Sequence, residues 1–330
     1  MTTVWLGRGV SNNVGLIEAL RARQLAVVVS HTLDHWAGQE YATSFKEPDI
    51  QGAEYVRWAA ETLIQEGFDY FIPGRCLGDF SSFPEQLSGK LVMGCAAPTS
   101  NDLDDKAIFY KKCQDANTDF VADFVCFTNR TTFEKARDYL KTRGHDKLCF
   151  KPVKGVFAQG FRILTDANPL DVLFQDCLTT IRTEDFLRWL DERPEQNLPP
   201  MILMPLFDGK ELSIDGSFDG THYRMVARLK NNASSQSIMV NEEVYETGMQ
   251  IAHLFGLKGL FNIQLMYHQG KPMVLEVNPR PAGGLAMSLL SEVDLIPPQL
   301  FGIDDPGSDL YRPQVERDIV STMAYFLKQP

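Results

Sequence analysis

Short apolar runs and helical patterns alternate along the first hundred residues. Continuous apolar runs are typical of buried strands. Between them, apolar positions recur every three or four residues, as on one face of a helix. Strands separated by helices predict a parallel sheet with helices on its faces. The predicted strands are residues 3–6, 25–29, 70–72 and 91–93, and the predicted helices are residues 14–23 and 53–66.

The turn after the first strand is rich in glycine. Residues 7–15 read Gly-Arg-Gly-Val-Ser-Asn-Asn-Val-Gly, which invites comparison with a dinucleotide-binding loop. The third glycine of that motif is missing at its required spacing, and no acidic residue ends the second strand. We therefore predict a tight strand-to-helix turn rather than an NAD or FAD site. A substrate contact at this turn remains an alternative.

The alternation continues through the rest of the chain. A helix is predicted from Ser100, a good N-cap residue, to about Ala116. The polar, partly helical stretch 168–200 has a Pro-rich end that marks a boundary. Further strands or apolar runs are expected at residues 148–151, 201–206, 211–215 and 223–229, and further helices at residues 132–142 and 241–257.

Composition and charge narrow the class of protein. A formal net charge of −11 argues against a general nucleic-acid binder, which needs a basic surface, but not against a small nucleotide site. The six cysteines include no CxxC pair, which favours reduced thiols over zinc ligands or disulfides. No apolar run reaches the roughly 18 residues of a membrane span, and the N-terminus lacks a signal-peptide pattern. We therefore expect a cytoplasmic protein without a membrane partner.

A strand pair over residues 261–278 carries the most informative pattern. Both halves alternate with the period of a strand around a turn containing Gly270. With Gly270 at the centre of the turn, Gln264 lies opposite Glu276, and Asn262 lies opposite Asn278. These four polar side chains then share one face, and apolar side chains fill the other. A slip of one residue would destroy this sorting, so the pattern itself indicates the register.

A carboxylate and amide oxygens on one face suit a hard cation. Mg²⁺ prefers oxygen ligands and is commonly held by one or two carboxylates together with substrate phosphates. Glu276 and Asn278 are two residues apart on a strand and point the same way. Arg280 follows after Pro279, where a guanidinium suits the charge of a transferring phosphoryl group. The alternative is a solvated polar face without a metal.

The segment Glu276-Val277-Asn278-Pro279-Arg280, preceded by Gln264, resembles the metal-binding end of the ATP-grasp superfamily. It is most similar to the carbamoyl-phosphate synthetase branch, in which Gln, Glu and Asn bind the metals and the following Arg contacts phosphate. Other members, such as D-alanine–D-alanine ligase, usually carry Asp in place of Gln264. The resemblance implies that Gln264, Glu276 and Asn278 bind Mg²⁺, with Mn²⁺ as an alternative ion, and that Arg280 is catalytic.

Two lysines and two glycines extend the resemblance upstream. Lys106 resembles the first cationic position of the superfamily. Lys151, followed by Gly155 and Gly160, resembles the second cation and the Gly-rich hairpin that closes over the phosphates. Lysine acts as a compact point charge, and glycines let backbone N–H groups approach an anion. The resemblance assigns ATP binding to all four residues and a catalytic role to Lys151.

The expected adenine hinge follows at residues 204–211. Met204 to Leu206 resemble the hinge itself, and Glu211 resembles the acidic residue that often binds ribose. Many members carry an acid where Met204 stands, which leaves the preference for ATP over other nucleotides open. Arg228 and Lys230 share one face of the next strand, in a region that tends to approach phosphates or the acceptor substrate in the superfamily.

The resemblance implies an α/β fold of the α+β ATP-grasp type. Residues 1–98 would form a Rossmann-like pre-ATP-grasp domain that helps to bind the non-nucleotide substrate. Residues 99–204 would form the N-terminal ATP-grasp subdomain with its Gly-rich lid, and residues 205–330 the C-terminal subdomain with the metal site. Gly283 is a further candidate for an anion contact through its amide.

The implied activity is ligation with ATP and Mg²⁺. A small-molecule carboxylate would be activated as an acyl phosphate and attacked by an amine. A kinase on the same fold and a nucleotide-binding module without catalysis are the two alternatives, and a homodimer remains open. Each candidate alone also fits an ordinary exposed side chain, and it is their order that indicates function: Lys106, Lys151, Glu211, Gln264, Glu276, Asn278, Arg280.

Overall fold

The computed structural model describes residues 1–10, 13–34, 36, 38, 41–155, 159–174, 179–192, 198–232, 234–303 and 311–320. The chain divides into two compact units. The first unit contains residues 1–101, 210–266 and those from 275 on, and the second contains residues 102–209 and 267–274. The three-part division expected from the sequence, at residues 98 and 204, remains a prediction.

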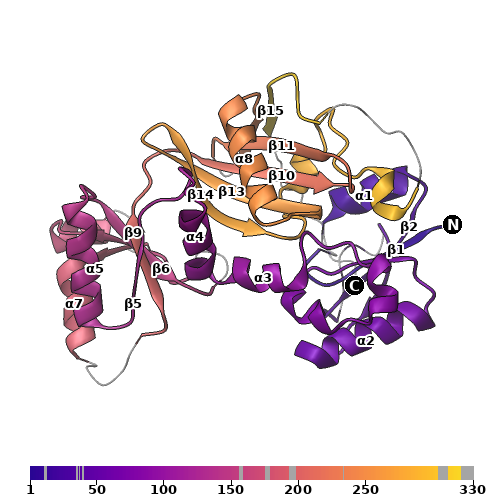
Figure 1. Ribbon diagram of the computed structural model, residues 1–330, viewed down its shortest axis with the longest axis horizontal. Helices are drawn as coiled ribbons and strands as arrows, with labels where there is room; N and C mark the ends of the chain where they lie inside the picture. The colour runs from indigo at the N-terminus through magenta and orange to yellow at the C-terminus, as the bar shows by residue number, and fades with distance from the viewer. Residues whose placement is uncertain are drawn as a thin grey trace. The chain divides into compact units, whose positions relative to one another are not determined.

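The N-terminal part of the first unit is a parallel sheet with the strand order β3-β2-β1-β4, and Figure 1 labels β1 and β2 of this sheet. The sheet confirms the predicted α/β architecture, because Leu6 packs with Leu16 of one helix while Trp5 packs with Tyr55 of the other, on the opposite face. The polar edge strand β3 had no apolar signal and was not predicted. The elements are β1 (Thr3–Leu6), α1 (Val14–Ala22), β2 (Ala26–His31), β3 (Thr43–Lys46), α2 (Gly52–Gln65) and β4 (Tyr70–Ile72).

Two sequence predictions in this region are wrong. Residues 91–93 form no strand: Leu91 makes a single bridge to Phe71, and Gly94 then donates its N–H to Pro279 instead. The helix expected from Ser100 is two helices, α3 (Ala97–Asp104) and α4 (Lys106–Asp115). The break lies at Asp105, whose extended backbone and side chain cap α4 by accepting from the N–H of Ile108. The apolar pattern alone did not reveal this cap.

The rest of the first unit is built on a six-stranded sheet with the order β14-β13-β10-β11-β12-β15. Helix α8 covers one face, where Gly248 lies against Ile214 and Met225. Helix α9 covers the other face, where Ser288 bonds to Asp215 and Arg228. The elements are β10 (Glu211–Phe218), β11 (Tyr223–Lys230), β12 (Ser235–Ile238), α8 (Glu242–Leu254), β13 (Gly259–His268), β14 (Lys271–Asn278), α9 (Leu285–Ser288), the 3-10 turn η3 (Pro298–Phe301) and β15 (Arg317–Val320).

Strands β13 and β14 are neighbours joined by a two-residue turn. Gln269 and Gly270 form this turn, and both have positive φ angles, 52° and 83°. Positive φ at both central residues is the requirement of the commonest hairpin turns. The turn is centred between these residues, half a residue from the centre assumed above. Without a bulge, this centre would place Gln264 opposite Leu275 rather than Glu276, so the turn does not support the register expected from a centre at Gly270.

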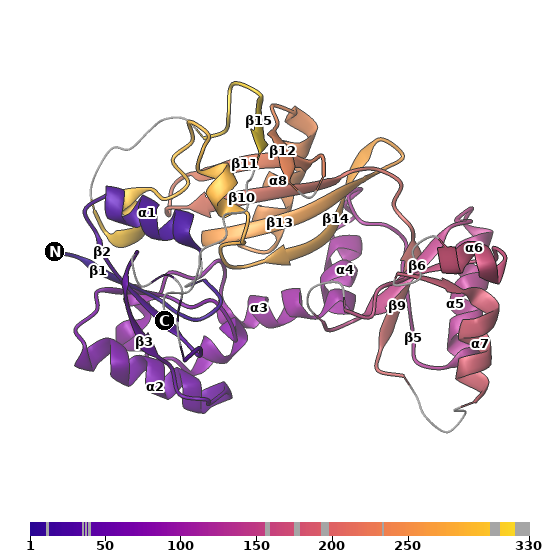
Figure 2. The same ribbon diagram turned by 180° about the vertical axis from the view of Figure 1, so that it is seen from behind.

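The second unit is built on a five-stranded sheet with the order β5-β9-β6-β7-β8. Helices α5 and α7 lie together on one side of it (Figures 1 and 2). Their side chains pack with Phe150 and Leu203 of the sheet in one apolar core. No helix in the described part of the chain is long and apolar enough to span a membrane. The elements are β5 (Val125–Phe127), α5 (Arg130–Thr142), β6 (Leu148–Pro152), β7 (Arg162–Thr165), α6 (Pro169–Phe174), β8 (Thr180–Arg182), α7 (Thr183–Asp191) and β9 (Met201–Pro205).

Candidate functional site

The candidate residues fall into two groups, one in each unit. The second unit holds most of the candidates for the nucleotide, and the first unit holds the ribose candidate Glu211 together with the candidates for the metal, the phosphoryl group and the substrate. The first group is Lys106, Lys151, Gly155, Gly160, Met204 and Leu206, and the second is Glu211, Arg228, Lys230, Gln264, Glu276, Asn278, Arg280 and Gly283.

Lys151 and the expected hinge share one face of the sheet in the second unit. Antiparallel pairing places Cys149 opposite Met204, and Lys151 opposite Ile202. Directly paired residues point to the same side of a sheet, so these four side chains lie together on the face away from α5 and α7. Burial raises the pKa of the Cys149 thiol to about 12, although the charge of Lys151 opposes this shift. Cys149 is therefore a neutral thiol at physiological pH.

The second cation candidate, Lys106, lies in the first turn of α4. Its backbone N–H donates to the carbonyl of Val153, and its Nζ donates to the carbonyl of Gly155, both over 3.1 Å. The helix start is thereby fastened to the segment that follows β6. Lys151 Nζ donates to the hydroxyl of Tyr110 over 2.8 Å, one turn further along α4. Lys106 thus joins the start of α4 to the segment after β6, and Lys151 contacts α4 through Tyr110.

The two glycines expected in the lid differ in what their positions require. Gly160 has a φ angle of +76°, and a methyl group there would lie 2.8 Å from Cγ of Pro152. This position needs glycine for both reasons. Gly155 has no such φ angle, and the nearest atom to an added methyl group is 3.8 Å away. Residues 156–158 between them lie outside the described residues.

The expected hinge residues form hydrogen-bonded pairs with β6 and with the residue that precedes it. The N–H of Leu206 donates to the carbonyl of Lys147 over 2.8 Å, so this amide already has an acceptor within the protein. Met204 is buried in the sheet. Any recognition of adenine here would rely on side chains and carbonyl groups rather than on the Leu206 amide. The sequence did not reveal that this amide is already bonded within the protein.

The metal candidates in the first unit include one close pair. Asn278 Nδ2 donates to Glu276 Oε1 over 3.2 Å, so the two side chains converge as their spacing predicts. Both are partly exposed, as is Gln264. No group of three or more His, Cys, Asp and Glu side chains in the described residues is suited to a metal, and Glu276 is the one carboxylate of the predicted set. One carboxylate with amide oxygens fits Mg²⁺ that also binds phosphate.

Asn262 is not on the exposed part of this face. Its side chain is fully buried, and Nδ2 donates to Asp215 Oδ1 over 2.8 Å and to Ser213 Oγ over 2.9 Å. Its Oδ1 has no hydrogen-bond partner among the described residues. The alternation pattern grouped Asn262 with Gln264 but could not show that a strand distant in sequence encloses it.

Arg228 is enclosed as well. Its side chain is 2% exposed, with Nη2 2.7 Å from Asp215 Oδ2 and Nε 2.7 Å from Ser288 Oγ. A methyl group at Gly284 would lie 2.6 Å from Nη2, so the guanidinium packs directly against this glycine. The expected substrate contact of Arg228 stays a prediction, but these bonds favour a role in holding α9 and the preceding turn to the sheet.

The remaining candidates lie nearer to the surface. Lys230 and Glu211 form a cross-strand ion pair of 3.1 Å, and both side chains are partly exposed. Arg280 is half-buried and donates to the carbonyl of Pro281 over 3.4 Å. Gly283 is exposed, and a methyl group there would meet no atom within 4 Å. This position therefore has no steric requirement for glycine, and the anion contact expected of the Gly283 amide stays a prediction.

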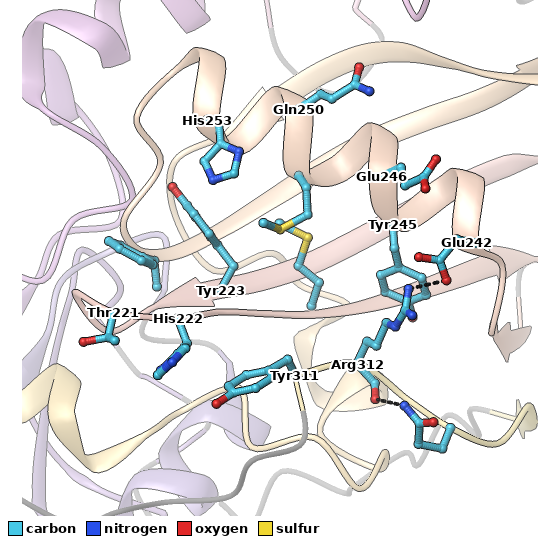
Figure 3. Close-up of a pocket in the computed structure, with 14 residues that line it drawn as sticks. Thr221, His222, Tyr223, Glu242, Tyr245, Glu246, Gln250, His253, Tyr311 and Arg312 are labelled. Carbon is cyan, nitrogen blue, oxygen red and sulfur yellow. Dashed lines mark hydrogen bonds and ion pairs between the residues drawn. The ribbon is translucent and has the colours of Figure 1, made fainter.

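A large groove of about 1120 Å³ lies elsewhere in the first unit, along α8 (Figure 3). Its walls include the stacked rings of His222 and Tyr311 and the edge-to-face rings of Tyr223 and His253. It opens on the α8 face of the sheet, whereas Asp215 and its partners lie on the opposite face. None of the candidate site residues predicted from the sequence lines this groove. The groove is therefore separate from the candidate site.

Comparison with known proteins supports the ATP-grasp resemblance for the C-terminal part of the chain. The family described as "ATP-grasp in the biosynthetic pathway with Ter operon" matches residues 197–322. This part of the chain is similar to the ATP-grasp superfamily. The matched region contains Gln264, Glu276, Asn278 and Arg280. The expected α+β ATP-grasp fold is confirmed, whereas the affinity to the carbamoyl-phosphate synthetase branch stays a prediction.

Solved structures agree on the fold. The chain is similar to biotin carboxylase from Campylobacter jejuni, solved as a β-γ-ATP complex, with a TM-score of 0.67, 12% identity, and coverage of 96% of this chain and 74% of that one. It is similar to an L-amino acid ligase from Bacillus licheniformis, with a TM-score of 0.61, 14% identity, and coverage of 87% and 69%. It is also similar to N5-carboxyaminoimidazole synthetase from Staphylococcus aureus, with a TM-score of 0.62, 13% identity, and coverage of 88% of this chain and 73% of that one.

Proposed function

We propose that this chain is an ATP- and Mg²⁺-dependent ligase that activates a small-molecule carboxylate as an acyl phosphate and joins it to an amine. The observation that carries the proposal is the convergence of Glu276 and Asn278 at the end of β14, on an ATP-grasp fold. Two structural neighbours, an amino acid ligase and a synthetase, support the same class of reaction.

The residues would divide the work as follows. Glu276, Asn278 and Gln264 would hold Mg²⁺, which supplies positive charge beside the phosphates of ATP. Lys106 and Lys151 would bind the phosphates, and Arg280 would offset the charge that develops as the γ-phosphoryl group moves to the carboxylate. Phosphoryl transfer depends mainly on positioning and electrostatics, so no side chain is assigned as a general base.

Binding of the other groups follows from the same arrangement. Met204 and the carbonyl groups of the hinge would contact adenine, and Glu211 the ribose. The glycines Gly155 and Gly160 would let the lid approach the phosphates. The partners under this proposal are the small-molecule carboxylate and amine, not nucleic acid.

A phosphate-release assay with ATP, MgCl₂ and mixed pools of carboxylates and amines tests the proposal. We expect phosphate release that requires both pools and that is lost in Glu276→Gln. Glu243→Gln, at an exposed position on α8, serves as the matched control and should leave the rate unchanged. Release of phosphate without any amine would contradict ligation. Formation of ADP and a stable phosphorylated product without free phosphate would indicate a kinase instead.

A further inference from the structure

Tyr110 is a buried tyrosine that makes a direct contact with a candidate phosphate-binding lysine. Its side chain is 1% exposed, and its hydroxyl accepts a hydrogen bond from Lys151 Nζ over 2.8 Å. The same Nζ lies 5.2 Å from the centre of the Tyr110 ring. One side chain therefore offers the lysine both a neutral acceptor and an aromatic face.

The Tyr110 ring is itself fixed. The rings of Phe109 and Phe124 lie 5.3 Å and 5.5 Å from it, centre to centre. The helix that carries it is capped by Asp105 and fastened by the N–H of Lys106 to Val153. The Tyr110 hydroxyl thus has a defined position relative to the end of β6, from which Lys151 projects.

Lys106 belongs to the same arrangement. It precedes Tyr110 by four residues, so both side chains lie on one face of α4. Lys106 Nζ donates to the carbonyl of Gly155, which follows Lys151 in the chain by four residues. One helix face is therefore in contact both with the lysine at the end of β6 and with the first glycine of the lid.

We propose that Tyr110 is a positioning residue that holds the Lys151 ammonium group where it meets the nucleotide phosphates. The inference rests on the proposed function, in which Lys151 binds those phosphates. Lysine has a long flexible stem, and a fixed acceptor reduces the number of places its charge can occupy. Because Tyr110 is enclosed while Lys151 is partly exposed, the tyrosine acts through the lysine and does not touch the nucleotide.

Two substitutions separate the contributions of the hydroxyl and the ring. Tyr110→Phe removes the hydroxyl and keeps the ring beside Phe109 and Phe124. Tyr110→Leu removes both. We expect Tyr110→Phe to weaken binding of ATP with MgCl₂ by about 10-fold or more, as for the loss of one hydrogen bond to a charged group. Tyr110→Leu should weaken it further, and Tyr139→Phe, at an exposed tyrosine of α5, should not change it.

A double-mutant cycle distinguishes positioning from a general structural role. Calorimetric titration with ATP and MgCl₂ is done for the parent chain, Tyr110→Phe, Lys151→Met and the double variant. We expect Tyr110→Phe to have no further effect once Lys151 is Met, because its effect passes through that ammonium group. An equal loss in both backgrounds would overturn the inference, as would unchanged affinity of Tyr110→Phe.

The proposed function fails in a different way. If the parent chain does not bind ATP with MgCl₂, or if Lys151→Met binds it as the parent does, the assigned role of Lys151 is wrong and the inference falls with it. If Lys151→Met loses binding and Tyr110→Phe does not, only the inference is overturned. Melting temperatures of all four proteins show whether any loss reflects unfolding.

Discussion

Arg228 in the first unit and Lys151 in the second are both cations on strands, but their surroundings differ. Arg228 is enclosed and forms an ion pair with Asp215. Lys151 is partly exposed and donates to the neutral hydroxyl of Tyr110. An enclosed ion pair is shielded from any ligand, whereas the partly exposed ammonium group of Lys151 can be reached by one. Enclosure, rather than the residue type, therefore separates a structural cation from a candidate ligand for phosphate.

Replacing the two cations gives the largest expected difference. Arg228→Met should lower the free energy of unfolding by about 3–5 kcal/mol, because Asp215 is left buried without its charged partner. Lys151→Met should lower it by less than about 1 kcal/mol, since this side chain is partly exposed. Urea titrations of both variants measure the difference. Similar losses of stability would show that the two cations are held alike, and Lys230→Met is the control for an exposed pair.

The two glycines expected in the lid should differ in how much stability their replacement by alanine costs, and this difference is smaller than that between the two cations. Gly160→Ala should cost about 1–2 kcal/mol of stability, because alanine resists the positive φ angle and its methyl group would press on Pro152, the residue after Lys151. Gly155→Ala has room for the methyl group and should change stability by less than about 0.5 kcal/mol. Denaturant unfolding of the pair checks this. A larger loss for Gly155→Ala would contradict the described backbone.

Acid should affect one partly buried carboxylate in each unit in the same direction. Burial raises the pKa of Asp219, but hydrogen bonds from Arg224 and from the N–H groups of His222 and Thr221 outweigh it and lower the pKa overall. In the second unit, bonds from Arg143 and His145 likewise outweigh burial and lower the pKa of Asp123.

A lowered folded pKa adds stability above the unfolded value of about 3.9, and this stability is lost as pH falls through the folded pKa. Asp219→Asn and Asp123→Asn should therefore be less stable than the parent at pH 7. That gap should narrow as the pH falls from about 5 toward 3. Unfolding free energies measured across this range test the prediction, and a gap that widened in acid would refute it.

Much of the fold follows from local patterns in the sequence. Strands β1 and β4 have the bounds that their apolar runs predict. The expected strand at residues 91–93 is absent because Gly94 bonds to Pro279, which is distant in sequence. Such a competition between distant backbone groups leaves no trace in a window of neighbouring residues.

The candidate site was predictable to the extent that it lies on single elements. Glu276 and Asn278 converge because they are two apart on one strand. The enclosure of Arg228 depends on Asp215 and Ser288 from other elements, which no local pattern reveals. Tyr110 had a usable signal, since it stands one helical turn after Lys106, but its contact with Lys151 arises only in the folded unit.

The most direct measurement is a calorimetric titration of the chain with ATP, with and without MgCl₂. If the proposed function holds, Lys151→Met will lose affinity under both conditions, and Glu276→Gln will lose the enhancement that MgCl₂ gives. Binding of ATP that is unchanged in both variants would contradict the account.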